Sequence, residues 1–169
     1  NQKIVRITSD PNDKYLKLQN VFFIGSGIAR GYLFRAIIAK SMVMTLPDLN
    51  SFHLKRSFYP VHYFYVFHSI ASTHRVYLEH AFDAYDTIFC VGEHHIKEIR
   101  KTEEIYNLPK KKLVKHGYGR LDNLLMEINK KEILNKKKDT LPRILIAPSW
   151  GKCSIVNEHL FRLIELLIL

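Results

Sequence analysis

Short apolar runs alternate along the chain with longer stretches in which apolar residues recur every three or four positions. The short runs are typical of strands in a parallel sheet, and the longer stretches are typical of amphipathic helices. Strands are predicted at 3–8, 21–25, 41–45, 61–67, 87–92, 113–118 and 143–147. Helices are predicted at about 30–40, 93–106, 121–135 and 160–169, with helix-like sequence also after residue 67. This alternation predicts an α/β fold with a Rossmann-like parallel sheet.

A charged segment that ends in proline divides this pattern, and residues 136–142 are therefore interpreted as a linker. We predict a Rossmann-like domain over 1–135 and the beginning of a second such domain over 143–169. The last predicted helix stops without the glycine, asparagine or basic turn that commonly ends a helix. Residue 1 lies only a few positions before the first predicted strand. We therefore expect the chain to be an internal fragment of a longer protein.

The composition is that of a basic globular protein. Hydrophobic residues make up 47% of the chain, which excludes disordered and low-complexity classes. The 26 Lys and Arg residues exceed the 16 Asp and Glu residues, and the net charge of +10 favours anionic partners. Nucleic acid is disfavoured among these because most aromatic residues fall within predicted strands rather than among the basic residues. Acidic lipid and phosphate-bearing substrates remain as the expected anionic partners.

Cysteine usage and run lengths limit where the protein works. The two cysteines, Cys90 and Cys153, are too few for a disulfide framework or a zinc quartet, so we interpret them as buried thiols in a reducing cytoplasm. The apolar runs are too short to span a bilayer. The lysine runs at 110–112 and 136–138 are either solvated segments or a surface attracted to anionic lipid or a polyphosphate acceptor.

His68 is the candidate general base. It ends the predicted strand 61–67, and ligands of open parallel sheets bind at the carboxyl ends of strands. A neutral imidazole there could take a proton from an alcohol. Ser69 follows it directly and is a candidate substrate-binding residue. The structural alternative is a histidine that caps the next helix.

Two further loops could bind phosphate. In the segment 117–120, two glycines permit close backbone approach and Arg120 offers paired donors. Asp122 is also a candidate substrate-binding residue and fits the N-cap of the helix that follows. After the predicted strand 143–147, Ser149 and Trp150 lie in a loop whose hydroxyl and amides would face a helix N-terminus.

No metal site or cofactor is predicted. His68, His74 and His80 recur along one segment, and His94, His95 and Glu98 along another, but neither set has the spacing of a known zinc motif.

Five segments, in this order, resemble the CDP-glycerol glycerophosphotransferases of teichoic-acid and related surface-polymer synthesis. They are Met44-Thr45-Leu46-Pro47-Asp48-Leu49, the run from Tyr65 to Tyr77 that contains Phe67-His68-Ser69, the run from Ala81 to Gly92, Gly117-Tyr118-Gly119-Arg120-Leu121-Asp122, and Ile144-Leu145-Ile146-Ala147-Pro148-Ser149-Trp150-Gly151.

The resemblance implies the GT-B architecture, with two Rossmann-like domains and an active site between them. By this comparison the chain is the acceptor-side domain, without its first strand, and the beginning of the donor domain. The implied reaction transfers glycerol phosphate from CDP-glycerol to a hydroxyl of a membrane-linked polymer or glycan and releases CMP. His68 occupies the place of the family's cleft histidine, which usually precedes glycine rather than Ser69. Ser149 and Trp150 would face the donor's pyrophosphate.

These expectations place the protein on the cytoplasmic face of the cell membrane as a peripheral enzyme, with CDP-glycerol and a lipid-linked anionic acceptor as its partners and no nucleic acid. Two alternatives stay open. One is a sugar-nucleotide glycosyltransferase or epimerase-like enzyme of capsule synthesis with the same fold. The other is a non-catalytic basic module that binds membrane or polymer.

Overall fold

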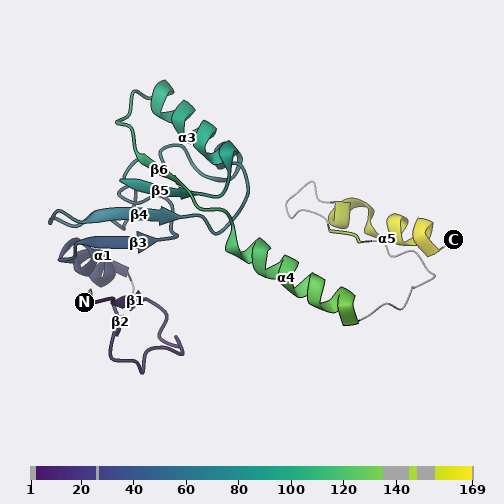
Figure 1. Cartoon of the computed structure of the whole chain (residues 1–169), viewed down its shortest axis with the longest axis horizontal. Coiled ribbons are helices and arrows are strands. Elements are labelled where there is room, and N and C mark those ends of the chain that lie inside the picture. The colour runs from purple at the N-terminus through teal and green to yellow at the C-terminus, as the bar shows by residue number, and fades with distance from the viewer. Residues whose placement is uncertain (1–2, 26, 135–144, 148–154, 169) are drawn as a thin grey trace. The chain divides into compact units, whose positions relative to one another are not determined.

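Four parallel strands form the main sheet in the order β3-β4-β5-β6. The computed structural model of the chain describes residues 3–25, 27–134, 145–147 and 155–168. Figure 1 shows the four strands side by side. They are β3 (Ser41–Met44), β4 (His62–Val66), β5 (Thr87–Cys90) and β6 (Lys112–Lys115). The predicted α/β class and the parallel sheet are confirmed, and the sheet is compatible with a Rossmann-like fold.

One face of this sheet is the core. Tyr65 of β4 lies in register with Met44 of β3 and Ile88 of β5, and all three side chains are buried. Phe34 and Ile99, from two different helices, belong to the same buried cluster. The strands follow one another in sequence across the sheet, so right-handed crossovers place the connecting helices on a single face.

Two helices connect the strands on this side. Helix α2 (Thr73–Val76) is a single turn after β4, and α3 (Glu93–Ile105) joins β5 to β6. His95 and Ile99 are buried on α3, four positions apart, as the period of an amphipathic helix requires. Helix α4 (Gly119–Leu134) begins two residues before the predicted start at 121.

The N-terminal segment forms a small sheet of its own. Strand β1 (Arg6–Thr8) pairs in parallel with β2 (Val21–Phe23), and helix α1 (Gly27–Arg35) follows. Gly25 and Gly27 have φ of 69° and 60°, values that favour glycine, and the turn lets the helix begin earlier than the predicted 30–40.

The chain divides into two compact units, at 1–124 and 125–169. In the second unit, α5 (Ile155–Ile168) lies where a terminal helix was predicted. The prediction of a strand over 143–147 is wrong for its described part, because 145–147 joins no strand ladder and Leu145 is 88% exposed. The predicted linker 136–142, together with Ser149, Trp150 and Cys153, lies outside the described residues. None of the described helices is long and apolar enough to cross a membrane.

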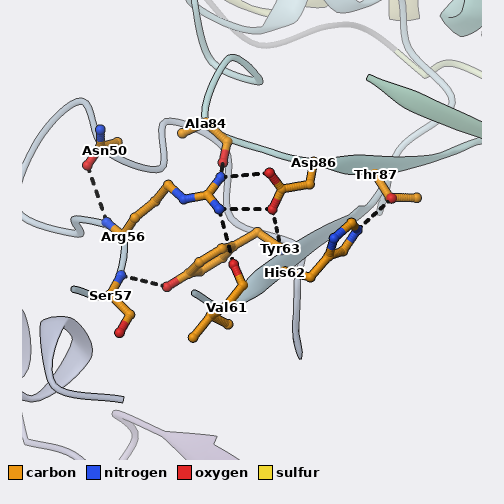
Figure 2. A network of polar contacts seen from close by, with 9 residues as sticks. All are labelled: Asn50, Arg56, Ser57, Val61, His62, Tyr63, Ala84, Asp86 and Thr87. Carbon is orange, nitrogen blue, oxygen red and sulfur yellow. Dashed lines mark hydrogen bonds and ion pairs between the residues drawn. The ribbon is translucent and has the colours of Figure 1, made fainter. Parts of the chain in front are cut away.

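A polar network joins the amino ends of β4 and β5 (Figure 2). Arg56 forms a two-pronged ion pair with Asp86, with N···O distances of 3.1 and 3.0 Å, and also donates to the carbonyls of Val61 and Ala84. The backbone N–H of Tyr63 donates to the same carboxylate at 2.7 Å. Burial raises the pKa of Asp86, but the Arg56 and Tyr63 hydrogen bonds outweigh it and hold the pKa below its usual range. This network stabilises the amino-terminal edge of the sheet, which is opposite to the strand ends that carry the candidate site.

Candidate functional site

A surface pocket of about 360 Å³ lies where β4 and β6 end. It brings together two loops that lie far apart in the sequence. The residues that line it are His68, Ser69, Ile70, Tyr118, Arg120, Leu121 and Leu124. Three of the predicted site residues, His68, Ser69 and Arg120, therefore share one pocket at the carboxyl edge of a parallel sheet, where such folds bind ligands.

His68 enters the pocket from the end of β4. Phe67, directly before it, is buried in the core, whereas His68 itself is exposed. Among the described residues its imidazole has no hydrogen-bond or ion-pair partner, so both ring nitrogens are open to a ligand. The alternative that His68 caps the next helix is wrong: α2 begins five residues later, and the N–H of Thr73 is bound by Glu98 instead.

Arg120 enters the pocket from the beginning of α4. After β6 the chain turns at Gly117, whose φ of 78° is a left-handed value, and the helix starts at Gly119. The guanidinium of Arg120 has no ion-pair partner in the described part of the chain. At the start of α4 the N–H groups of Leu121 and Asp122 already donate to the carbonyl of Tyr118, and the dipole of a helix favours negative charge near its N-terminus. The side chain and the helix end therefore make this side of the pocket suitable for an anion.

Asp122 does not take its predicted place. It lies in the first turn of α4 rather than at the N-cap, because the helix already starts at Gly119. Its backbone N–H donates to the carbonyl of Tyr118, and its side chain is not among those that line the pocket.

Two histidines of α3 hold the loop that follows His68. His94 contacts the carbonyl of Ile70 through Nε2 at 3.1 Å, and His95 contacts the carbonyl of Ala71 through Nε2 at 2.9 Å. The other ring nitrogen of His95 accepts the N–H of Val91 at 3.4 Å. Burial lowers the pKa of His95, although the bond to Ala71 opposes this, and the hydrogen bond that Nδ1 accepts from Val91 requires the neutral form of the ring.

Glu98 holds the next part of the same loop. Its carboxylate accepts the hydroxyl of Ser72 at 2.7 Å and both the N–H and the hydroxyl of Thr73 at 2.6 Å. Burial raises the pKa of Glu98, but the bonds from Thr73 and Ser72 outweigh it and keep the pKa below its usual range. Glu98 thus stabilises the N-terminus of α2 as an ionised carboxylate from a neighbouring helix.

Three of the histidines considered as metal ligands are engaged in other contacts. His94 and His95 bind backbone carbonyls, and His80 pairs with Asp83 at 2.7 Å. Within the described ranges, no group of three or more His, Cys, Asp or Glu side chains is arranged to hold a metal ion.

A second hollow, of about 250 Å³, lies along α1. Glycines 27 and 31 form part of it, with Ile28 and Tyr32 from the helix and Phe52, His53 and Lys55 from a loop. Ile28 and Tyr32 are 82% and 71% exposed, and Arg35 and Lys55 also line the hollow. This surface combines exposed apolar groups with positive charge.

Three residues that line or support the first pocket, Tyr118, His95 and Glu98, are not predicted as site residues from the sequence. The sequence assigns no role to Tyr118, the last residue of the predicted strand 113–118, yet its hydroxyl donates to the carbonyl of His68 at 2.9 Å. His95 and Glu98 were considered only as metal ligands. The sequence signal for a shared role is their spacing, because positions 95, 98 and 99 lie on one face of a helix.

No family model, no curated protein and no solved structure matches this chain. Its function must therefore be inferred from the pocket and its residues. A free imidazole beside a guanidinium and a helix N-terminus can accept a proton while negative charge is stabilised nearby.

Proposed function

We propose that the protein transfers glycerol phosphate from CDP-glycerol to a hydroxyl of a membrane-linked polymer or glycan. The observation that carries this proposal is the single pocket that joins His68 and Ser69, after β4, to Arg120, at the beginning of α4. The resemblance to the CDP-glycerol glycerophosphotransferases rests on these same loops. A base and an anion site in one pocket are the two elements that attack by an alcohol on a pyrophosphate requires.

The proposed transfer is a displacement at the phosphorus atom that carries glycerol. The acceptor hydroxyl loses its proton to the imidazole of His68, and its oxygen forms a bond to the phosphorus that carries glycerol. The bond from that phosphorus to the bridging oxygen breaks, and CMP leaves with the electron pair. Arg120 and the N-terminus of α4 stabilise the negative charge on the phosphate oxygens, and Ser69 contributes a hydroxyl to substrate binding.

In the proposed GT-B architecture the donor's pyrophosphate would also meet the loop of Ser149 and Trp150, in a second Rossmann-like domain. The resemblance is the support for this part of the proposal. It rests on the order of the segments in the sequence.

The acceptor side of the proposal places the enzyme peripherally on the cytoplasmic face of the membrane. The net charge of +10 suits an acidic, lipid-linked substrate. The hollow along α1 is compatible with the same location, because Arg35 and Lys55 would attract anionic headgroups beside the exposed side chains of Ile28 and Tyr32. That surface also favours the second candidate, a non-catalytic module that only binds membrane or polymer.

A donor competition assay tests the proposal. The protein, expressed from its complete reading frame, is supplied with CDP-glycerol, an acceptor membrane fraction and an excess of competing UDP-sugars. The proposal predicts CMP release that the UDP-sugars do not suppress. Turnover of a UDP-sugar in place of CDP-glycerol would support the capsule-type enzyme. Vesicle binding that salt abolishes, without turnover of any donor, would support the binding module.

A further inference from the structure

The first two turns of α3 contact the loop after β4 and the last residue of β6. On one side, three side chains, His94, His95 and Glu98, bind the loop at residues 70–73, and we call these three the α3 bracket. On the other side, Glu93 forms an ion pair with Lys115, the last residue of β6. One short piece of helix therefore contacts both the loop that follows His68 and the end of the strand that leads to Arg120.

We propose that His95 and Glu98 are positioning residues for His68, and that the α3 bracket fixes the geometry between His68 and the anion site at Arg120. This inference rests on the proposed function for its catalytic consequence, but the restraint on the loop can be measured without turnover.

The loop needs a restraint from α3 because its backbone makes few hydrogen bonds of its own. Between the end of β4 and the start of α2, the carbonyls of Ile70 and Ala71 accept hydrogen bonds only from side chains of α3 in the described part of the chain. A segment with so few backbone bonds of its own would sample many conformations. His68 has no side-chain partner, so the position of its ring depends on where the backbone of this loop is held.

His95 is suited to this role by its two different nitrogens. Nε2 donates to Ala71, Nδ1 accepts from Val91, and the ring packs on Phe67 with 3.9 Å between ring centres. Phe67 is the residue directly before His68 and is 4% exposed. His95 therefore holds the chain on both sides of the candidate base, through a ring contact before it and a hydrogen bond after it.

Glu98 is suited to positioning this loop because its carboxylate has two acceptor oxygens. Oε1 accepts from Ser72 and Oε2 from Thr73, and His74 Nδ1 lies 3.5 Å from Oε1. Three donors converge on this carboxylate, so an amide in its place would satisfy only part of them. A misplacement of a catalytic group by about 1 Å can lower a rate by roughly 100-fold, which sets the size of the effect to expect.

The experiment uses the full-length protein and four variants. Glu98→Ala removes the acceptor, His95→Leu removes both hydrogen bonds of the ring, and His95→Gln keeps an amide that can donate to Ala71. Lys101→Ala is the control, because it lies on the same helix in an exposed ion pair with Glu104. Amide hydrogen exchange of 69–74 reports the restraint, kcat and KM for the donor report its consequence, and thermal unfolding reports the fold.

We expect Glu98→Ala and His95→Leu to speed exchange at 69–74 at least tenfold and to lower kcat about 10- to 100-fold, while KM for the donor changes less than threefold. His95→Gln should recover most of kcat, and Lys101→Ala should match the wild type. Unchanged exchange and kcat in Glu98→Ala would overturn the inference, as would a loss of kcat that only follows the fraction of unfolded protein.

The two proposals fail differently. If the wild type turns over no donor but Glu98→Ala still accelerates exchange at 69–74, the transferase proposal fails and the restraint by the α3 bracket stands. If the wild type turns over CDP-glycerol and the variants retain both rate and protection, the bracket has no positioning role.

Discussion

The phenol of Tyr118 donates a hydrogen bond of 2.9 Å to the backbone carbonyl of His68, across 50 positions of sequence. This bond joins the loop after β4 to the loop after β6 over the end of β5, which lies between them in the sheet. It ties the two sides of the pocket directly to each other, beside the indirect connection through α3.

Replacing Tyr118 by phenylalanine should separate the two loops while keeping the ring. The lost hydrogen bond is at an exposed position, so we expect the free energy of unfolding to fall by only about 0.5–1 kcal/mol. CMP release should fall by a larger factor than this stability loss explains. Urea unfolding and donor turnover measure the two effects, with Tyr59→Phe as the control because that ring lies outside the pocket. Equal turnover in both variants would contradict a role for the bond.

Arg120 should act mainly on the phosphates of the donor. We expect Arg120→Gln to weaken donor binding and lower kcat/KM by roughly 10- to 100-fold, because a charged donor to a developing phosphate charge is lost. Arg120→Lys keeps the charge without the planar pair of donors, so its kcat/KM should lie between those of the wild type and Arg120→Gln. Steady-state kinetics with CDP-glycerol check this order, and Lys101→Gln controls for the loss of one positive charge. Full activity in Arg120→Gln would remove this residue from the site.

Arg56 should matter for stability and not for chemistry. Arg56→Met would remove four hydrogen bonds and leave the carboxylate of Asp86 without its ion-pair partner. Both side chains are about one-third exposed, so solvent reduces the cost, and we expect a loss of about 2–3 kcal/mol. The matched control is Arg6→Gln, because the Arg6 side chain is 51% exposed and makes a single hydrogen bond to Asp13, so its loss should cost much less than that of Arg56. Urea unfolding that ranks the two variants the other way would contradict this account.

The stability of the first unit should decrease as pH falls below about 6.5, the ordinary pKa of histidine. Burial lowers the pKa of His95 in the folded protein, so the unfolded chain binds a proton first on acidification. The stabilisation is fully present above the unfolded pKa and is lost as pH falls through the folded one. The unfolding midpoint of the wild type should therefore fall more between pH 7 and pH 5 than that of His95→Gln.

The control for this profile is His53→Gln, since His53 is exposed. Its profile should follow that of the wild type. A wild-type profile that His95→Gln leaves unchanged would assign the pH dependence to another group.

The sheet was predictable because its strands are locally distinctive. The alternation of Tyr63, Tyr65 and Phe67 marks the buried face of β4, and the run 87–90 marks a strand that is buried almost throughout. Local pattern fails where a neighbour decides the structure. The described residues of the predicted strand 143–147 join no ladder, although their apolar pattern is strand-like, because a strand exists only with a partner.

The candidate site was predictable in part, for a similar reason. The ends of parallel strands meet at one edge of a sheet, so His68 and Arg120 could be placed near each other from their positions after predicted strands. The bonds from His95 and Glu98 to the loop could not be anticipated, because they depend on how α3 packs against that loop. Asp122 failed as an N-cap because the helix continues through Gly119 and Arg120, residues whose sequence suggested a turn.

The proposed transfer and the role of His68 are tested together by CMP release from CDP-glycerol, compared between the wild type and His68→Ala in the protein from its complete reading frame with acceptor membranes supplied. We expect release by the wild type and a loss of at least about 100-fold in the variant at unchanged thermal stability, because general acid–base catalysis contributes about 10²–10⁴-fold. Equal release by the two proteins would contradict the role of His68 as the base, and no release by the wild type would contradict the proposed reaction.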